Sequence, residues 1–273
     1  MRTVLPFFKR GLTITVLWLI SMILLPLALL IATSLQLKGA DIWSIVTSER
    51  VISSILLSFK MSFIATIVNL IFGFLLAWIL VRYNFWGKNI VNALIDLPFA
   101  LPTAVAGIAL ASLYAPTGLI GNALEKIGIQ IAYTPSGIAI ALIFVSLPFI
   151  VRAIQPVLQN LDPSYEEAAN ILGVGKFTTL TRVIIPALLP AIIGGAGMGF
   201  ARSLGEYGSV IFIAGNVPLV SEIAPLIIMS KLDLYDVRGA SVVALLMISI
   251  SFILIFLINA LQWQVSKKMT QVK

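Results

Sequence analysis

The sequence predicts an all-α polytopic membrane protein that crosses the bilayer six times. Of its 273 residues, 60% are hydrophobic and only 11% are charged, whereas roughly a quarter of the residues in an average soluble domain are charged. The apolar residues gather in long runs, several of which reach the roughly 20 residues that a helix needs to cross a hydrocarbon core about 30 Å thick. Because lipid cannot satisfy an irregular backbone, these runs are expected to be helices.

Six apolar segments define the expected helices of a single membrane domain that covers residues 1–273. They lie at about 12–35, 61–81, 94–114, 137–151, 187–214 and 240–263. The first segment follows Arg2, Lys9 and Arg10, as the core of a signal peptide would. Its apolar length of roughly 24 residues exceeds the usual 7–15 of a signal core, so we expect it to be retained as a helix.

The distribution of basic residues predicts which side of the membrane each connection faces. Six crossings place both termini, residues 82–92 and residues 152–186 on one side. Most of the basic residues lie on that side: Arg2, Lys9, Arg10, Arg82, Lys88, Arg152, Lys176, Arg182, Lys267, Lys268 and Lys273. By the positive-inside rule this side is cytoplasmic. The sequence therefore predicts a multi-pass cell-membrane protein with cytoplasmic termini, and it fits a plastid membrane as well.

The composition excludes several classes of function. The chain contains no Cys and no His, which removes disulfides, thiolate or imidazole metal sites, and catalytic arrangements that require either residue. The net charge of +7 is not gathered into a basic stripe with interleaved aromatic residues, so no nucleic-acid partner is expected. No Walker motif is present, because Gly175-Lys176 is followed by Phe177. We expect no catalytic residue, metal or cofactor in this chain.

The long cytoplasmic connection, residues 152–186, contains a short helix with both ends marked. Asp162 is a favourable N-cap, Pro163 suits the first helical position, and Gly173 can take the left-handed conformation that ends a helix. A narrow apolar stripe with i, i+3, i+4 and i+7 spacing is formed by Tyr165, Ala168, Ala169 and Leu172. The chain's own helices, the lipid interface or a groove on a partner protein could cover this stripe. Small Ala residues beside acidic ones favour the partner.

The same loop resembles the EAA loop of the permeases of binding-protein-dependent ABC importers. That pattern is Glu-Ala-Ala, three residues, Gly, nine residues, an apolar pair and Pro, with a mild departure here at Val183 and Ile185. The resemblance implies the type I importer permease (MetI-like) fold and a loop helix that docks into a cytoplasmic ATPase, which binds the ATP. The predicted coupling residues are Tyr165, Glu167, Ala168, Ala169, Leu172, Gly173 and Pro186.

A charged pair interrupts the fifth apolar segment. Arg202 and Glu206 have the i, i+4 spacing of an ion pair on one helix face. Such a pair has two possible roles. It fixes helix packing or an outer gate in one of them, and it lies on the path of a substrate in the other. Helix breaks at Pro98, Pro102, Gly205 and Gly208 would present free backbone N–H groups to an anion.

Two segments narrow the substrate by resemblance. Residues 202–216 resemble the sulfate and molybdate permease group, and residues 96–107 resemble sulfate/thiosulfate permeases more specifically. The likeness runs from about Leu56 to Trp263. The predicted residues of the substrate pathway or gate are Thr103, Arg202, Ser203, Glu206 and Ser209.

The resemblance also implies the partners. They are a second homologous permease, two ATP-binding cassette subunits, an extracytoplasmic sulfate-binding protein and the lipid bilayer. A molybdate or tungstate importer is the nearest alternative. An ATPase-independent secondary anion transporter and a membrane enzyme or assembly factor are more distant ones. A secondary carrier would be expected to have more paired ionisable groups within its spans than Arg202 and Glu206.

Overall fold

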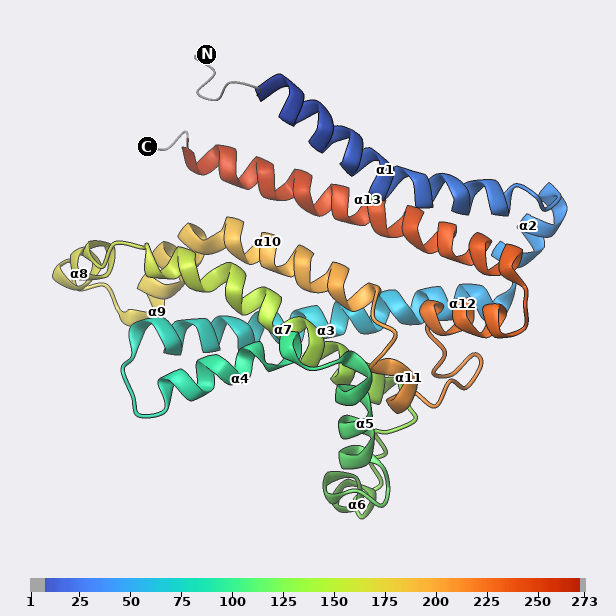
Figure 1. Cartoon of the computed structure of the whole chain (residues 1–273). Coiled ribbons are helices and arrows are strands. Elements are labelled where there is room, and N and C mark those ends of the chain that lie inside the picture. The colour runs from blue at the N-terminus through green and yellow to red at the C-terminus, as the bar shows by residue number, and fades with distance from the viewer. Residues whose placement is uncertain (1–7, 271–273) are drawn as a thin grey trace.

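The structure is a computed structural model in which residues 8–270 are described, the side chains as far as Lys267. Arg2 and Lys273 lie outside these bounds, as does the side chain of Lys268. The described chain consists of helices joined by turns and loops (Figure 1). The helices are α1 (Phe8–Ser34), α2 (Gly39–Val46), α3 (Glu49–Arg82), α4 (Lys88–Ala100), α5 (Thr103–Tyr114), α6 (Leu119–Glu125), α7 (Pro135–Gln159), α8 (Ser164–Ile171), α9 (Lys176–Thr179), the π-helix η1 (Leu180–Ile184), α10 (Ile185–Leu204), α11 (Val210–Ile213), α12 (Ala224–Asp233) and α13 (Val237–Thr270).

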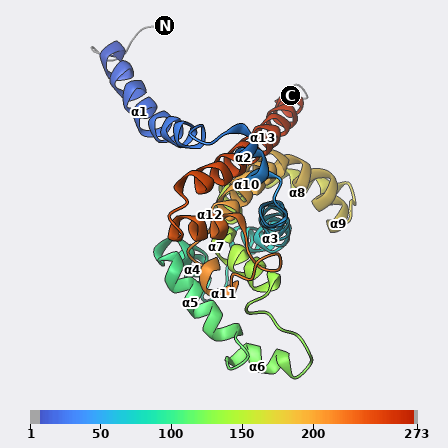
Figure 2. The same ribbon diagram turned by 90° about the vertical axis from the view of Figure 1, so that its right-hand side faces the viewer.

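Three long helices form the centre of the bundle. α3 packs along α7, and α10 packs against both of them, while α13 covers α10 (Figures 1 and 2). The hydrophobic core between them is divided into clusters, one of which gathers Ala77, Leu80, Ile150, Ile154 and Leu188 from α3, α7 and α10. Burying these side chains removes apolar surface from contact with lipid and water and fixes the relative positions of the helices.

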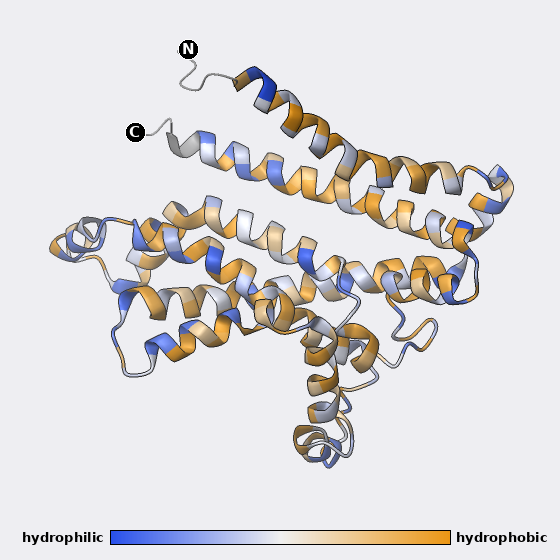
Figure 3. Cartoon of the chain, viewed as in Figure 1, coloured by the Kyte–Doolittle hydropathy of each residue, from blue (hydrophilic) through white to orange (hydrophobic). Residues whose placement is uncertain are grey.

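The surface of the bundle is apolar, as a lipid-facing surface must be. Ser34 is the only buried residue of α1, which packs on α13 with its other faces exposed. Figure 3 shows hydrophobic residues over most of the length of α1 and α13. Among the described residues, six helical segments are long and apolar enough to cross a membrane: Phe8–Ser34, Glu49–Arg82, Thr103–Glu125, Pro135–Gln159, Lys176–Leu204 and Val237–Lys267. The chain is an all-α membrane protein.

The predicted third segment, 94–114, is not one helix. α4 ends at Ala100 and α5 begins at Thr103, and α5 leaves the bundle at a steep angle to α4 (Figure 1). Leu101 is extended (φ −85°, ψ 134°) because it precedes Pro102, whose ring disfavours the helical conformation of the preceding residue. Pro98, in contrast, lies inside α4 and does not interrupt it. The third apolar span of the structure therefore covers α5 and α6.

The predicted fifth segment, 187–214, also differs from the structure. The helical path begins at Lys176, runs through η1 into α10 and ends at Leu204. Gly205 ends α10, and the chain then turns through residues 205–209 into the short helix α11. The fourth helix, α7, extends from Pro135 to Gln159, well beyond the predicted 137–151. Polar residues near these helix ends lower the local hydropathy, so the hydropathy of the sequence did not locate the ends of these two helices.

Candidate functional sites: the exposed helix α8 and the buried pair at the end of α10

Both ends of α8 carry the signals that the sequence predicted. The side chain of Asp162 accepts a hydrogen bond of 2.9 Å from the backbone N–H of Ser164, and this bond holds the pKa of that exposed carboxyl below its usual value. At the other end Gly173 has a φ of +72°. There the N–H of Val174 donates to the carbonyl of Ala169 and the N–H of Gly173 donates to the carbonyl of Asn170. This is a Schellman ending, which turns the chain sharply after α8.

The apolar stripe of α8 is largely uncovered by the described part of the chain. Only Ala169 is buried; Tyr165, Ala168 and Leu172 are exposed. Two further apolar side chains, Ile171 (86% exposed) and Phe177 (77% exposed), lie beside the stripe and were missed by the sequence analysis. Ile171 lies outside the i, i+3, i+4 pattern and Phe177 lies beyond the turn. The exposed apolar side chains of Tyr165, Ala168, Ile171, Leu172 and Phe177, on α8 and the segment that follows it, are here called the α8 surface.

One ion pair holds α8 against the end of the bundle. Arg82, the last residue of α3, lies 2.6 Å from the carboxylate of Glu166. The guanidinium group of Arg82 also lies 5.8 Å from the centre of the Trp78 ring, within the range of a cation–π contact. Glu166 therefore faces the bundle, while Glu167 is exposed. Reading the sequence alone could not pair residues as far apart as Arg82 and Glu166.

A continuous helical path begins at Lys176, after the turn that follows α8, and runs into the bundle. Pro186, at the start of α10, has no N–H to donate and its ring would collide with the carbonyl four residues earlier in a regular α-helix. The preceding turn is widened into the π-helix η1, and the N–H of Ile185 donates to the carbonyl of Leu180. After this turn α10 continues to Leu204.

At the other end of α10, the predicted ion pair is formed. Arg202 lies 2.7 Å from Glu206, whose side chain is 2% exposed. The second carboxylate oxygen of Glu206 accepts hydrogen bonds from the backbone N–H (3.0 Å) and the hydroxyl (3.1 Å) of Ser209. Glu206 therefore neutralises Arg202 and holds the turn between α10 and α11. A buried carboxylate with these partners is stable only while the partners stay in place.

The two segments singled out in the sequence meet at this turn. A Cβ atom on Gly107 would lie 2.4 Å from the carbonyl oxygen of Ser209, and one on Gly208 would lie 2.2 Å from the hydroxyl of Thr103. α5 therefore packs backbone to backbone on residues 207–209, which is possible only because both glycines lack a side chain. Thr103 and Ser209 are brought to one site with Arg202 and Glu206.

Ser203 has a different environment. Its side chain is 1% exposed, and its hydroxyl has no hydrogen-bond partner among the described residues. Nothing in its geometry assigns it to the same contact as Thr103 and Ser209. Its place in a substrate pathway stays a prediction.

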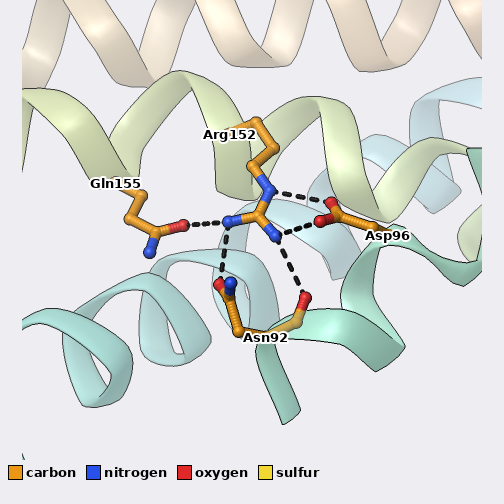
Figure 4. A network of polar contacts seen from close by, with 4 residues as sticks. All are labelled: Asn92, Asp96, Arg152 and Gln155. Carbon is orange, nitrogen blue, oxygen red and sulfur yellow. Dashed lines mark hydrogen bonds and ion pairs between the residues drawn. The ribbon is translucent and has the colours of Figure 1, made fainter. Parts of the chain in front are cut away.

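Two further polar clusters escaped the sequence analysis. Near the other end of α3, Arg50 donates to both carboxylate oxygens of Glu222 at 2.7 and 2.6 Å, and the side chain of Glu222 is fully buried. On the side of α8, Arg152 of α7 binds Asp96 and Asn92 of α4 and Gln155 of its own helix (Figure 4). Their partners lie far apart in the sequence, which gives no signal of these contacts.

Comparisons with known proteins agree on one family. The family model described as "Binding-protein-dependent transport system inner membrane component" matches residues 69–271. The chain is 44% identical over 261 residues to the "Sulfate transport system permease protein CysT" of Escherichia coli (strain K12), covering 96% of this chain and 94% of that protein. It is 46% identical over 249 residues to the protein of the same name from Synechocystis sp. (strain ATCC 27184 / PCC 6803 / Kazusa), covering 91% and 87%.

Solved structures share the fold at much lower identity. A bacterial ABC transporter for the import of the acidic polysaccharide alginate matches with a TM-score of 0.76 at 15% identity, covering 94% of this chain and 95% of that chain. The MetNI methionine ABC transporter, in an inward-facing conformation, matches with a TM-score of 0.61 at 16% identity, covering 84% and 99%. From its matched residues, its relatives and its fold, the chain belongs to the family of binding-protein-dependent transport system inner membrane components.

Proposed function

We propose that this chain is the channel-forming permease subunit of an ATP-driven importer of sulfate or thiosulfate. The α8 surface is the observation that carries the coupling part of this proposal. Its apolar side chains lie on α8, which is tied to the bundle by Glu166 and Arg82, and on the turn and α9 that follow it. The chain then continues through η1 into α10. Exposed apolar side chains on a rigid helix fit a groove on a protein partner. The partner of this surface is the ATPase subunit, which binds and hydrolyses the ATP.

The choice of sulfate is supported by relatives with this specificity in their names. Proteins called sulfate transport permeases are 44–46% identical to this chain over more than nine tenths of its length. The full complex would contain a second homologous permease, two ATP-binding cassette subunits and an extracytoplasmic sulfate-binding protein. One solved neighbour is an alginate ABC transporter in complex with a periplasmic protein, which supports a binding-protein partner in general. Molybdate or tungstate is the alternative cargo to be tested.

The orientation follows from the proposed partner. α8 and both ends of the described chain lie at the same end of the bundle (Figure 1), and that end would be cytoplasmic because the ATPase is. The Arg202–Glu206 pair and Thr103, Ser203 and Ser209 would then lie toward the opposite side, as part of the pathway or its gate. The pairing of Arg202 with Glu206 favours a gate, because the cation is already neutralised.

Purification of the intact complex tests this proposal. The chain, expressed with its neighbours and purified through an affinity tag, should bring with it an ATPase and a second permease, identified by mass spectrometry. In proteoliposomes with the soluble binding protein, sulfate should stimulate ATP hydrolysis and accumulate, and molybdate should not compete at equal concentration. Preference for molybdate would replace sulfate as the cargo. Sulfate accumulation without ATP would indicate a secondary transporter.

Two variants test the coupling role of α8 in the same assay. Glu167→Arg reverses the charge of an exposed residue of α8, and Gly173→Asp removes the glycine at its left-handed turn. Both should uncouple ATP hydrolysis from uptake or release the ATPase from the complex. Glu125→Arg, a matched charge reversal on the exposed end of α6, should leave both activities intact. If Glu167→Arg and Glu125→Arg behave alike, α8 is not the coupling element.

A further inference from the structure

The guanidinium group of Arg152 uses all five of its N–H donors within the protein. Its Nε and one terminal nitrogen donate to the two carboxylate oxygens of Asp96, at 2.8 and 2.6 Å. That terminal nitrogen also donates to the backbone carbonyl of Asn92 at 3.0 Å. The other terminal nitrogen donates to the side-chain oxygens of Asn92 and Gln155 (Figure 4). The network joins α4 to α7 and neutralises Asp96.

This arrangement decides which way two carboxamides point. A guanidinium group is only a donor, so Asn92 and Gln155 must both turn their oxygen atoms toward it. Their NH₂ groups are therefore directed elsewhere. Within the described part of the chain, neither NH₂ group has a protein acceptor at hydrogen-bonding distance. Arg152 thus acts as a positioning residue that leaves a set of N–H donors unused.

Asn92 and Gln155 both line a polar pocket at the end of the bundle that carries α8. The pocket, about 260 Å³ in volume, lies between α3, α4 and α7. Its polar lining consists of Lys88, Asn89, Asn92, Gln155 and Gln159. It contains one ammonium group and four carboxamides and no carboxylate. One N–H of Lys88 is used by the side chain of Asn84 at 3.1 Å, which leaves two for a ligand.

We propose that this pocket binds a tetrahedral oxyanion, and that its ligand is the transported anion on its way to the cytoplasm. Free N–H donors beside one cation, with no anion in the lining, match the oxygen shell of a sulfate-like ion. Neutral donors also suit release, because a transport site must bind weakly enough to let the ion leave. This inference rests on the proposed function for the identity of the anion. The phosphate of an anionic lipid has the same oxygen chemistry and is the competing source.

The double variant Asn92→Asp/Gln155→Glu provides a sharp test. Each change keeps the oxygen that faces Arg152 and replaces a free NH₂ donor by a carboxylate oxygen, so the network that joins α4 to α7 is retained. The double variant adds two negative charges. Asn160→Asp adds one such charge at the exposed end of α7, outside the pocket, and serves as the control for charge near this end of the bundle. Binding of radiolabelled sulfate is measured on the intact complex without its binding protein, in nanodiscs of zwitterionic lipid and in nanodiscs that also contain anionic lipid. ATP-driven uptake is measured in proteoliposomes.

The wild-type complex should bind sulfate in zwitterionic nanodiscs. The double variant should bind it at least about tenfold more weakly, because two N–H donors are replaced by carboxylate oxygens that repel an anion. Uptake should fall with binding, while Asn160→Asp should match the wild type. Equal sulfate affinity in the double variant and the wild type overturns the proposal. A variant effect that appears only with anionic lipid overturns the assignment to the transported ion. A wild-type complex that transports no sulfate instead contradicts the proposed function, and sulfate binding still reports on the pocket.

Discussion

Replacing Gly173 by Ala isolates the contribution of the turn after α8. The residue has a φ of +72°, and no atom lies within 4 Å of the position that a Cβ would take. An added methyl group therefore meets no steric obstacle, and the only cost is the backbone conformation, about 1–2 kcal/mol for an L-residue in the left-handed region. This cost lowers the population of the native turn relative to alternatives by a factor of roughly 5–30.

Gly175→Ala is the matched control for this change. Gly175 also has nothing within 4 Å of its Cβ position, but its φ is −64°, which any residue adopts. Gly173→Asn provides an intermediate case, because Asn tolerates positive φ better than Ala. The expected order of coupled uptake is wild type and Gly175→Ala highest, Gly173→Asn next and Gly173→Ala lowest.

Two measurements would establish the mechanism. Binding-protein-stimulated ATP hydrolysis and uptake in proteoliposomes report coupling. Hydrogen exchange reports the amides of Gly173 and Val174, whose bonds to Asn170 and Ala169 exist only in this turn. If Gly173→Ala matched Gly175→Ala in exchange, in hydrolysis and in uptake, the turn would not set the orientation of α8 and the reasoning would be refuted.

Three further predictions concern the other contacts. Gly107→Ala should force α5 and the turn at Ser209 apart by about 1 Å, because its Cβ would lie 2.4 Å from the Ser209 carbonyl oxygen where an ordinary contact needs about 3.4 Å. We expect reduced uptake with normal membrane insertion, and unchanged uptake would contradict this expectation. Glu206→Gln leaves the charge of Arg202 unbalanced and should lower the free energy of unfolding by up to about 3–5 kcal/mol. The thermal unfolding temperature of the complex should fall, and an unchanged temperature would show that the pair contributes nothing to stability. Glu166→Gln should weaken the contact of α8 with Arg82 by about 1 kcal/mol or less, because the pair is partly exposed. Faster hydrogen exchange of the α8 amides would report this weakening, and Arg82→Gln should have the same effect if the pair is the cause.

The expected positions of the membrane helices were set by apolar length, and their ends were the weakest part of the prediction. Apolar runs located α1, α3, α7 and α13, since a membrane helix must be apolar over its lipid-exposed length whatever its neighbours are. The break at Pro102 is visible in the sequence, but a proline at membrane depth is compatible with either a kink or a break. Its outcome depends on the packing of α5 against residues 207–209, which no run of hydropathy reveals.

The α8 helix is the clearest case of local determination. Asp162, the apolar stripe and Gly173 are close in sequence, and caps, periodicity and a left-handed glycine act within one or two turns. The same is true of the pair formed by Arg202 and Glu206, which are one helical turn apart. The chemistry of these contacts is specified locally, so the sequence predicted them.

The sequence by itself determined that this protein is an α-helical membrane protein, that α8 has its two marked ends, and that its loop resembles that of importer permeases. Only the tertiary structure decided which polar residues meet. The ion pairs Arg152–Asp96 and Arg82–Glu166 each join residues far apart in the chain. The polar pocket likewise brings together side chains from α3, α4 and α7. Hydrogen bonds and ion pairs act over a few ångströms, so their partners are fixed only when helix packing brings distant segments together.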